Sequence, residues 1–367
     1  MKLLISAGEP SGDQRGAEVL AKLKEISGEE IYAFGLGGKK LGEAGLDIKR
    51  DMTSYAVMGF TEIAMSLSRF LALERYLTDL AWKEKPQAAL LVDYPGFNMR
   101  LGRKLRKMGI PVIQYVAPQM WAWGDWRVKK LKNSCDLLLS LFQFEETFFR
   151  KRGLRAVFTG HPLKENIQEN PKPGECLGLL PGSRAQEVKY LLPPMLRAFE
   201  ELRDRGVISS ARLAVSDHLD PSAYLQADHI PGLSLVKGSE EVLKESRAAL
   251  VCSGTATLEA ALHNVPFVVC YRTSMVTYTL ARILVRGVKR IGMANIVAGC
   301  DVAPELIQRK VTTENIISQL LPLLETGSAR DHIMQRLPLV RRNLGEGDPA
   351  GNAAGEVLNL IRGSNEP

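Results

Sequence analysis

The stretch LLVDYPGFNMR (residues 90–100) places a carboxylate directly after an apolar run, where a buried strand is expected to end. An aspartate in that position either caps a turn or acts as a general base toward a bound substrate. On the pattern alone both interpretations stay open. Pro95 and Gly96 already supply the turn without help from Asp93, so the residues leave Asp93 available for chemistry.

A second stretch, LLPGSRAQEV (179–188), leaves an apolar run through a small-residue turn that contains an arginine. Backbone N–H groups, the Ser183 hydroxyl and the Arg184 guanidinium of such a turn can converge on a diphosphate. The alternative is a surface turn with a solvated arginine. Pro193-Pro194 predicts that the main helix starts there, which would make 184–191 a separate short turn.

A third stretch, CSGTATLEAA (252–261), also passes from a strand into a helix through small residues. Ser253, Gly254 and Thr255 surround the expected helix start, where exposed N–H groups suit a phosphate. Glu259 lies one turn further on and can accept hydrogen bonds from two ribose hydroxyls. The alternative for Glu259 is a side chain that only complements the helix dipole.

Other candidate sites are weaker. SAGEPSGD (6–13) departs from the GxGxxG pattern, so it is a poor dinucleotide fingerprint, although Glu9 follows the first strand and would face a cleft between domains. The five cysteines are scattered, without CxxC or Cys/His ligand spacing, which predicts reduced thiols and no metal site in the protein.

Short apolar runs that alternate with helical segments predict the elements that position these residues. The expected strands are 2–7, 31–38, 88–93, 111–117, 137–142, 156–160, 176–182, 211–216, 233–238, 248–254 and 266–272. Such runs indicate parallel sheets covered on both faces. A polar segment at 163–175 divides the pattern, so we predict an α/β fold of two doubly wound halves, with ligands at the carboxyl ends of strands and a shared substrate in a cleft between the halves.

The segment 58–85 is a helix with a wide apolar stripe and cationic flanks. One interpretation is a core helix with a broad buried face. The other is that part of the stripe is exposed and contacts a bilayer surface or acyl chains. The residues that would make this contact are Phe60, Ile63, Leu67, Phe70 and Leu71.

The composition is that of an ordinary globular protein, with 367 residues and a formal charge of +7. A modest basic excess suits an anionic ligand or membrane face, and the alternative is a surface slightly rich in Lys and Arg. The N-terminal apolar run is too short for a signal peptide, and no apolar run approaches the ~18 residues of a membrane span. Any membrane contact is therefore expected to be peripheral.

Several motifs occur in an order that resembles one known family. They are AGEPSGD, AVMGFTEI, DYPGFN, YVAPQMWAW, GHPL, LPGSRAQEV, SGTATLEA and ANIVAG…PELIQ, spread over residues 6–308. Together they resemble the lipid-A-disaccharide synthases, inverting glycosyltransferases with the GT-B fold. That family joins UDP-2,3-diacylglucosamine to 2,3-diacylglucosamine 1-phosphate (lipid X), giving a β-1,6 disaccharide and UDP.

The resemblance implies roles for single residues. Asp93 matches the family's catalytic base and Arg184 its diphosphate-binding arginine. Further active-site candidates are Glu9, Asn295, Glu305 and Gln308.

The chain also departs from the family pattern at three positions. Ala294 and Cys300 stand where the family usually has proline and arginine, so an acceptor-phosphate contact from residue 300 is not expected. Gly96 replaces a second aspartate, which leaves Asp93 as the only carboxylate of its motif.

The resemblance further implies a domain plan and partners. Residues 1–165 would form the acceptor and membrane-facing domain, 166–345 the UDP-sugar domain, and 346–367 a helix that packs on the first domain or on a partner. We expect a cytoplasmic protein peripheral to the inner membrane, with a homodimer as one option, and no nucleic acid. No cofactor and no essential metal are expected, since the chain has no DxD motif.

Two other functions remain as alternatives. One is a different GT-B activity on UDP-GlcNAc, such as a 2-epimerase, against which the wide apolar stripe argues. The other is a non-catalytic membrane-surface protein that binds a nucleotide.

Overall fold

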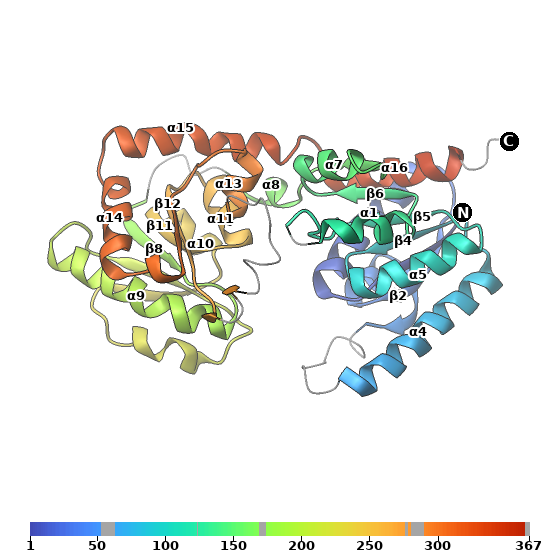
Figure 1. Cartoon of the computed structure of the whole chain (residues 1–367), viewed down its shortest axis with the longest axis horizontal. Helices are drawn as coiled ribbons and strands as arrows, with labels where there is room; N and C mark the ends of the chain where they lie inside the picture. The colour runs from blue at the N-terminus through green and yellow to red at the C-terminus, as the bar shows by residue number, and fades with distance from the viewer. Residues whose placement is uncertain (53–62, 123, 169–173, 276–277, 280–289, 364–367) are drawn as a thin grey trace. The chain divides into compact units, whose positions relative to one another are not determined.

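The computed structural model describes residues 1–52, 63–122, 124–168, 174–275, 278–279 and 290–363 (Figure 1). It divides into two compact units, of which unit 1 is Met1–Pro162 with Gly345–Pro367 and unit 2 is Leu163–Leu344. The chain therefore passes from one unit to the other twice. The last helix, α16 (Pro349–Gly363), belongs to unit 1 and packs against α1 (Pro10–Ile26).

Unit 1 is built on a parallel sheet that has seven strands in the described part of the chain, in the order β3-β2-β1-β4-β5-β6-β7. The strands are β1 (Lys2–Ala7), β2 (Tyr32–Gly37), β3 (Leu46–Asp51), β4 (Ala88–Val92), β5 (Val112–Tyr115), β6 (Leu137–Ser140) and β7 (Ala156–Phe158). The remaining helices are α2 (Lys39–Glu43), α4 (Ile63–Glu84), α5 (Pro95–Lys107), the 3-10 turn η2 (Asp125–Arg127), α6 (Val128–Lys132) and α7 (Gln143–Arg150).

Both faces of this sheet are covered, which explains why its strands are apolar throughout. Leu3 and Ile5 of β1 pack in the cluster under α1 and α16, while Leu4 between them packs under α4 and α5. This alternation follows from the two-residue period of a strand. The sheet is therefore the middle layer of a three-layer unit.

Unit 2 repeats the plan with a six-stranded parallel sheet among its described residues, in the order β10-β9-β8-β11-β12-β13. Its strands are β8 (Cys176–Leu180), β9 (Ala211–Val215), β10 (Leu233–Lys237), β11 (Ser246–Cys252), β12 (Phe267–Tyr271) and β13 (Glu305–Ile307). Its helices are α8 (Leu163–Asn166), α9 (Ala185–Asp204), η3 (Pro221–Ala227), α10 (Glu240–Lys244), α11 (Thr255–Leu262), α13 (Met293–Ala298), η4 (Gln308–Lys310), α14 (Thr313–Leu324) and α15 (Ser328–Asn343). The prediction of two doubly wound parallel sheets is confirmed.

In each sheet the strand order reverses beside the first strand of the unit. The reversal lies between β1 and β4 in unit 1 and between β8 and β11 in unit 2. Loops that leave the two strands at such a point turn to opposite faces of the sheet and open a crevice, where ligands of this fold class bind.

The start of α9 differs from the prediction. The helix begins at Ala185 and continues through Pro193 and Pro194, so 184–191 is not a separate turn. Glu187 and Arg184 form a capping box that starts the helix early. The buried side chains Val188, Leu191, Leu192 and Met195 then keep helical spacing across the prolines, and this burial offsets the lost N–H groups.

Part of the apolar stripe on α4 belongs to the core of unit 1. Leu73 and Leu77 are buried there, and Phe70 and Leu71 are half-buried. The Phe70 ring lies 6.2 Å from that of Tyr94. Phe60 and the side chains of Ile63 and Leu67 lie outside the described residues. Membrane contact by this helix stays a prediction.

A buried carboxylate joins α4 to α5. The buried Glu74 carboxylate forms ion pairs with Arg100 Nη2 at 2.9 Å and with Lys104 Nζ at 2.9 Å. Two cations thus compensate one carboxylate that burial would otherwise penalise. The pairing holds the Arg100 guanidinium on one side of α5.

Helix α5 also lies very close to the end of α6 because it carries a glycine at the contact. A Cβ atom at Gly102 would overlap the backbone carbonyl oxygen of Ser134. Neither backbone can move aside as a flexible side chain would. Gly102 therefore sets the spacing between α5 and the α6 segment.

We expect Gly102→Ala to lower the free energy of unfolding of unit 1 by about 1–3 kcal/mol through overpacking, even though alanine favours a helix by about 1 kcal/mol. Urea unfolding followed by tryptophan fluorescence measures this unit, because all tryptophans of the chain (Trp82, Trp121, Trp123 and Trp126) belong to it. Gly96→Ala on the same helix is the control, since a Cβ there meets nothing within 4 Å. Equal unfolding midpoints for both variants would contradict the close-contact explanation.

Candidate active site

Asp93 lies at the carboxyl end of β4, beside the strand-order reversal of unit 1. Asp93 and Tyr94 both have left-handed backbone conformations, with φ of 51° and 47°. Such a conformation is uncommon for residues other than glycine and costs of order 1–3 kcal/mol, so it persists only where neighbouring groups hold it. The strained pair turns the Asp93 side chain out of the strand at the start of α5.

Asn98 is the group that holds this turn. It is fully buried, and its Nδ2 donates to the carbonyl oxygens of Asp93 at 2.9 Å and Val92 at 3.1 Å. Its Oδ1 accepts the Ser6 hydroxyl at 2.8 Å. Gln114 Nε2 adds a second donor to the Asp93 carbonyl at 3.1 Å. Side chains from β1, α5 and β5 thus fix the backbone of Asp93.

The Asp93 carboxylate has charged neighbours from α1 and its N-terminal end. Arg15 Nη1 lies 3.9 Å from Asp93 Oδ2, and the Tyr94 N–H donates to Asp93 Oδ1 at 3.0 Å. Partial burial, and then the charge of Asp93, raise the pKa of Glu9. The structure thus brings the predicted residues Glu9 and Asp93 together. Arg15 and Asn98 were not predicted, and only Asn98 lies in a quoted motif, DYPGFN.

The turn after β8 already binds a carboxylate. Glu187 Oε2 accepts the N–H groups of Ser183 at 3.2 Å and Arg184 at 3.3 Å, and Glu187 Oε1 pairs with Arg184 Nη1 at 2.8 Å. The backbone donors expected to be free for a diphosphate are therefore engaged by an internal anion. The Arg184 side chain is 81% exposed, so it is accessible to a ligand.

The turn after β8 lies close to the last residue of β11, at the reversal point of unit 2. A Cβ at Gly182 would lie 3.2 Å from Cys252 Sγ. The Ser253 hydroxyl donates to the Ile291 carbonyl at 2.8 Å. Gly254 is the N-cap of α11, which starts at Thr255.

Glu259 lies on the same helix and differs from Glu187 in having no internal partner among the described residues. In the described part of the chain its carboxylate has no hydrogen bond and no ion pair, and the residue is half-buried. The chemistry predicted for it, acceptance of ribose hydroxyls, is thus open to it.

Asn295 and Glu305 are occupied by internal contacts. Asn295 Nδ2 donates to the Ala303 carbonyl and to Glu305 Oε1, both at 2.8 Å, and Asn295 Oδ1 accepts two backbone N–H groups. Glu305 also accepts the Gly292 N–H at 2.8 Å at the start of α13. These two candidates connect β13 to α13.

Gln308 is different from this pair. It is buried at the end of β13 with φ of 54°, and among the described residues its Nε2 has no hydrogen-bond partner. A buried amide donor without a partner is costly unless a ligand or water completes it.

Comparison with known proteins identifies the family. A family model described as lipid-A-disaccharide synthetase matches residues 3–347. The chain belongs to this family. The lipid-A-disaccharide synthase of Koribacter versatilis is 37% identical, over 99% of this chain and 99% of that protein. The lipid-A-disaccharide synthase of Anaeromyxobacter sp. (strain K) is 40% identical, over 98% of each chain.

Solved structures with low sequence identity show the same fold. UDP-GlcNAc 2-epimerase from Neisseria meningitidis, bound to UDP-GlcNAc, matches with a TM-score of 0.60 at 14% identity, over 99% of this chain and 100% of that one. MurG from Acinetobacter baumannii matches with a TM-score of 0.59 at 15% identity, over 99% of both. These matches support the predicted GT-B architecture.

The resemblance drawn from the motifs is confirmed, and the chain is a glycosyltransferase of the lipid-A-disaccharide synthetase family. The 2-epimerase alternative is not favoured, because the proteins of high identity are synthases. In this family member, Asp93 and the Arg184 turn lie at the strand-order reversals of their two sheets. The roles of individual residues remain predictions.

A buried carboxyl group lies elsewhere in unit 1. Glu145 of α7 is buried, and Trp121 Nε1 donates to its Oε1 at 3.1 Å. Burial raises the pKa of Glu145 to about 8. The Trp121 ring packs edge-on against Phe144 at 4.9 Å, so its surroundings are those of a packed loop.

Glu145 is expected to make the stability of unit 1 depend on pH. Between about pH 4.5 and pH 8 the folded protein retains a proton that the unfolded chain releases, so the free energy of unfolding falls as pH rises through this window. Glu145→Gln carries no charge and should remove that fall, as measured by urea unfolding at pH 5 and pH 9. Glu146→Gln, next along the helix, serves as the control, and an unchanged fall in Glu145→Gln would refute this cause.

Asn98→Asp tests the support of the strained turn. The substitution keeps the shape but replaces a donor by an acceptor facing carbonyl oxygens, so we expect a loss of about 1–3 kcal/mol in unfolding free energy together with a loss of disaccharide synthesis. Urea unfolding and product formation measure the two effects. For stability the control is the exposed Asn133→Asp. Wild-type stability in Asn98→Asp would show that other groups hold the turn.

Proposed function

We propose that the chain transfers diacylglucosamine from UDP-2,3-diacylglucosamine to the 6-hydroxyl of 2,3-diacylglucosamine 1-phosphate, giving a β-1,6 disaccharide and UDP. Membership of the family supports this reaction. The observation that carries the residue assignment is the placement of Asp93 on a strained, half-buried turn that the buried Asn98 supports, at the reversal of the sheet. The proposal assigns the acceptor to unit 1 and the donor to unit 2.

Asp93 is proposed as the general base. A primary hydroxyl has a pKa far above 7, so its proton must pass to a base as the oxygen attacks the anomeric carbon. The hydroxyl oxygen forms the new bond to that carbon, and the proton moves to the Asp93 carboxylate. Attack on the face opposite UDP converts an α donor to a β product, so the reaction inverts the anomeric configuration.

The donor is proposed to bind at the carboxyl edge of the sheet in unit 2. The bond between the anomeric carbon and the diphosphate oxygen breaks, and its electron pair leaves with UDP. Arg184, Ser183 and the start of α11 at Ser253, Gly254 and Thr255 would stabilise that charge. Glu187 must then release the N–H groups of the Arg184 turn, because a phosphate oxygen and its carboxylate compete for the same donors.

The other candidates take supporting roles in this proposal. Within the described ranges the Glu259 carboxylate and the Gln308 Nε2 have no internal partner, so the first is proposed to accept the ribose hydroxyls and the second to donate to the donor substrate. Asn295 and Glu305 position the neighbouring backbone through their internal hydrogen bonds. Glu9 lies beside Asp93 and would contact the acceptor sugar.

Membrane attachment is proposed to be peripheral, at the cytoplasmic side of the inner membrane. In the ranges that the structure describes, no helix combines the length and the apolar character needed to cross a bilayer. The acyl chains of both substrates would keep them in a lipid surface. The half-buried Phe70 and Leu71 on α4 remain candidates for that contact, and a homodimer stays a prediction.

Asp93→Asn is expected to reduce disaccharide formation by about 10²–10⁴-fold, because the amide cannot accept the hydroxyl proton. The assay incubates the enzyme with both acyl-sugar substrates and detects the disaccharide phosphate by mass. Asp79→Asn, an exposed aspartate of α4, is the matched control and should keep wild-type turnover. Near-full activity in Asp93→Asn would end the base assignment, and epimerisation of non-acylated UDP-GlcNAc by the wild type would favour the alternative activity.

A further inference from the structure

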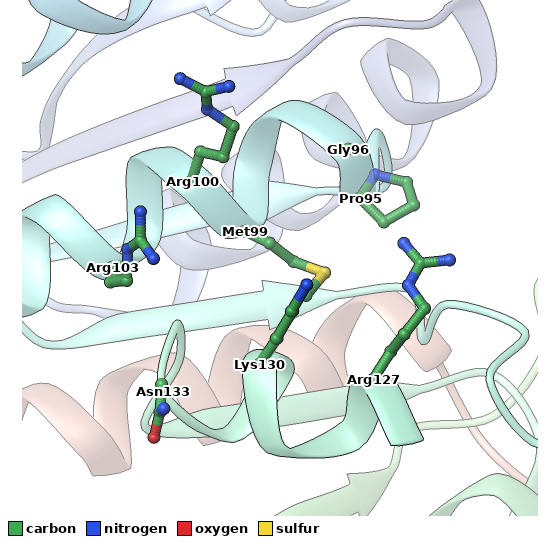
Figure 2. A pocket seen from close by; sticks show the side chains of 8 residues that line it. All are labelled: Pro95, Gly96, Met99, Arg100, Arg103, Arg127, Lys130 and Asn133. Atoms are coloured by element: carbon green, nitrogen blue, oxygen red, sulfur yellow. The ribbon is translucent and has the colours of Figure 1, made fainter. Parts of the chain in front are cut away.

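A basic pocket of about 480 Å³ opens between α5 and the η2–α6 segment (Figure 2). Its volume falls within the ~300–1,000 Å³ range of small-molecule sites. The pocket is lined by Pro95, Gly96, Met99, Arg100, Arg103, Arg127, Lys130 and Asn133. Four of these eight are cations, and none of these described lining residues is an acid. The charge of the pocket therefore suits an anionic group.

The cations of the pocket are only partly compensated. Arg100 shares the buried Glu74 carboxylate with Lys104. Arg103 and Lys130 have no carboxylate within ion-pair distance in the described part of the chain, although Lys130 Nζ lies 5.3 Å from the centre of the Trp126 ring. Arginine binds phosphate oxygens in pairs, so a phosphate would relieve the repulsion among these side chains.

The N-terminal end of α5 adds to the positive potential of the pocket. Pro95 and Gly96 are the first residues of this 13-residue helix, and both line the pocket, as Figure 2 shows. The dipole of the helix favours an anion at this end. A Cβ at Gly96 would meet nothing within 4 Å, so the approach to this helix end is open.

The pocket begins two residues beyond Asp93. In the reaction proposed above, the acceptor must present its 6-hydroxyl to Asp93, and its phosphate is attached to C1 of the same sugar, across the ring oxygen from the carbon that bears the hydroxymethyl group. One sugar can thus extend from Asp93 to the pocket. The donor diphosphate is already assigned to unit 2, which leaves the acceptor phosphate without a partner.

We propose that this pocket binds the phosphate monoester of the acceptor sugar, an inference that rests on the proposed function. A phosphate monoester carries a charge of about −1.5 to −2 at pH 7. The phosphate diester of a phospholipid headgroup such as phosphatidylglycerol carries a single negative charge. The four cations that line the pocket match the monoester better. The shared phosphate chemistry makes a bilayer headgroup the competing source, and the exposed Trp126 beside the pocket (74% exposed) makes that source worth testing.

The experiment compares two charge-reversal pairs on the same two helices. Arg103→Glu/Lys130→Glu changes the pocket, and Lys107→Glu/Lys129→Glu makes the same change in charge on exposed residues of α5 and α6 that do not line it. Each enzyme is assayed at saturating donor with 2,3-diacylglucosamine 1-phosphate and with the same acceptor lacking the phosphate. Arg103→Ala, a milder single variant, covers the case in which the first pair does not fold.

We expect the pocket pair to raise the KM for the phosphorylated acceptor by about 10- to 100-fold, the effect of losing charge-assisted hydrogen bonds. The KM values for the unphosphorylated acceptor and for the donor should stay at wild-type values, as should all values of the control pair. An unchanged preference for the phosphorylated acceptor in the pocket pair would overturn the inference.

Two further measurements separate the inference from its competitors. Loss of binding to phosphatidylglycerol vesicles in the pocket pair, with the acceptor preference kept, would assign the pocket to lipid headgroups instead and overturn the inference. Equilibrium binding of the phosphorylated acceptor in detergent micelles decides the case in which the wild type makes no disaccharide. The absence of disaccharide synthesis by the wild type would end the proposed function. A Kd for the phosphorylated acceptor that is raised about tenfold or more in the pocket pair would still support phosphate binding.

Discussion

Parallel strands that share one direction bring their carboxyl ends to one edge of a sheet, and this constraint places the candidate base and the candidate diphosphate-binding turns of the protein. In unit 1 it puts the loop with Glu9 next to the loop with Asp93, because β1 and β4 are neighbours. In unit 2 it puts the Arg184 turn next to the Ser253 turn, because β8 and β11 are neighbours. Residues distant in sequence meet because the strand order reverses between them.

The two edges carry opposite chemistry. In unit 1 a carboxylate is held out of a strand by a left-handed backbone pair, and buried amides from other elements maintain that conformation. In unit 2 the N–H groups of Ser183 and Arg184 donate to the Glu187 carboxylate. The proposed base is thus held in place by its surroundings, which would reduce the reorganisation that proton transfer requires. The proposed anion site differs, because Glu187 would have to move before a ligand could reach the same N–H groups.

Much of the fold could be predicted from the sequence, since fully apolar runs between helical segments describe covered parallel strands. Asp93 and Arg184 could also be found, because each follows such a run within a few residues. The predicted start of α9 was wrong, because it relied on the preference of proline for the first turn of a helix. The capping box and the burial of side chains on both sides of Pro193 and Pro194 instead extend the helix back to Ala185. A rule based on neighbours in sequence does not include that burial.

Other features depended on contacts that no local pattern encodes. The Asn98 contact with Ser6 joins residues 92 positions apart, and the raised pKa of Glu145 follows from burial rather than from its neighbours in sequence. The basic pocket combines cations of α5 with cations of η2 and α6, whose spacing forms no motif. Such features become visible only once the packing of helices on the sheet is known.

The return of the chain to unit 1 has a consequence for biosynthesis. Ala353, Val357 and Ile361 of α16 complete the cluster on one face of the first sheet, although they are translated after the whole of unit 2. Domains usually fold in the order in which they leave the ribosome. Here one apolar face of the N-terminal sheet is covered by α1 but not yet by α16 while unit 2, a single uninterrupted segment, is synthesised. Until α16 is translated, the apolar residues of unit 1 that it covers stay exposed on the nascent chain.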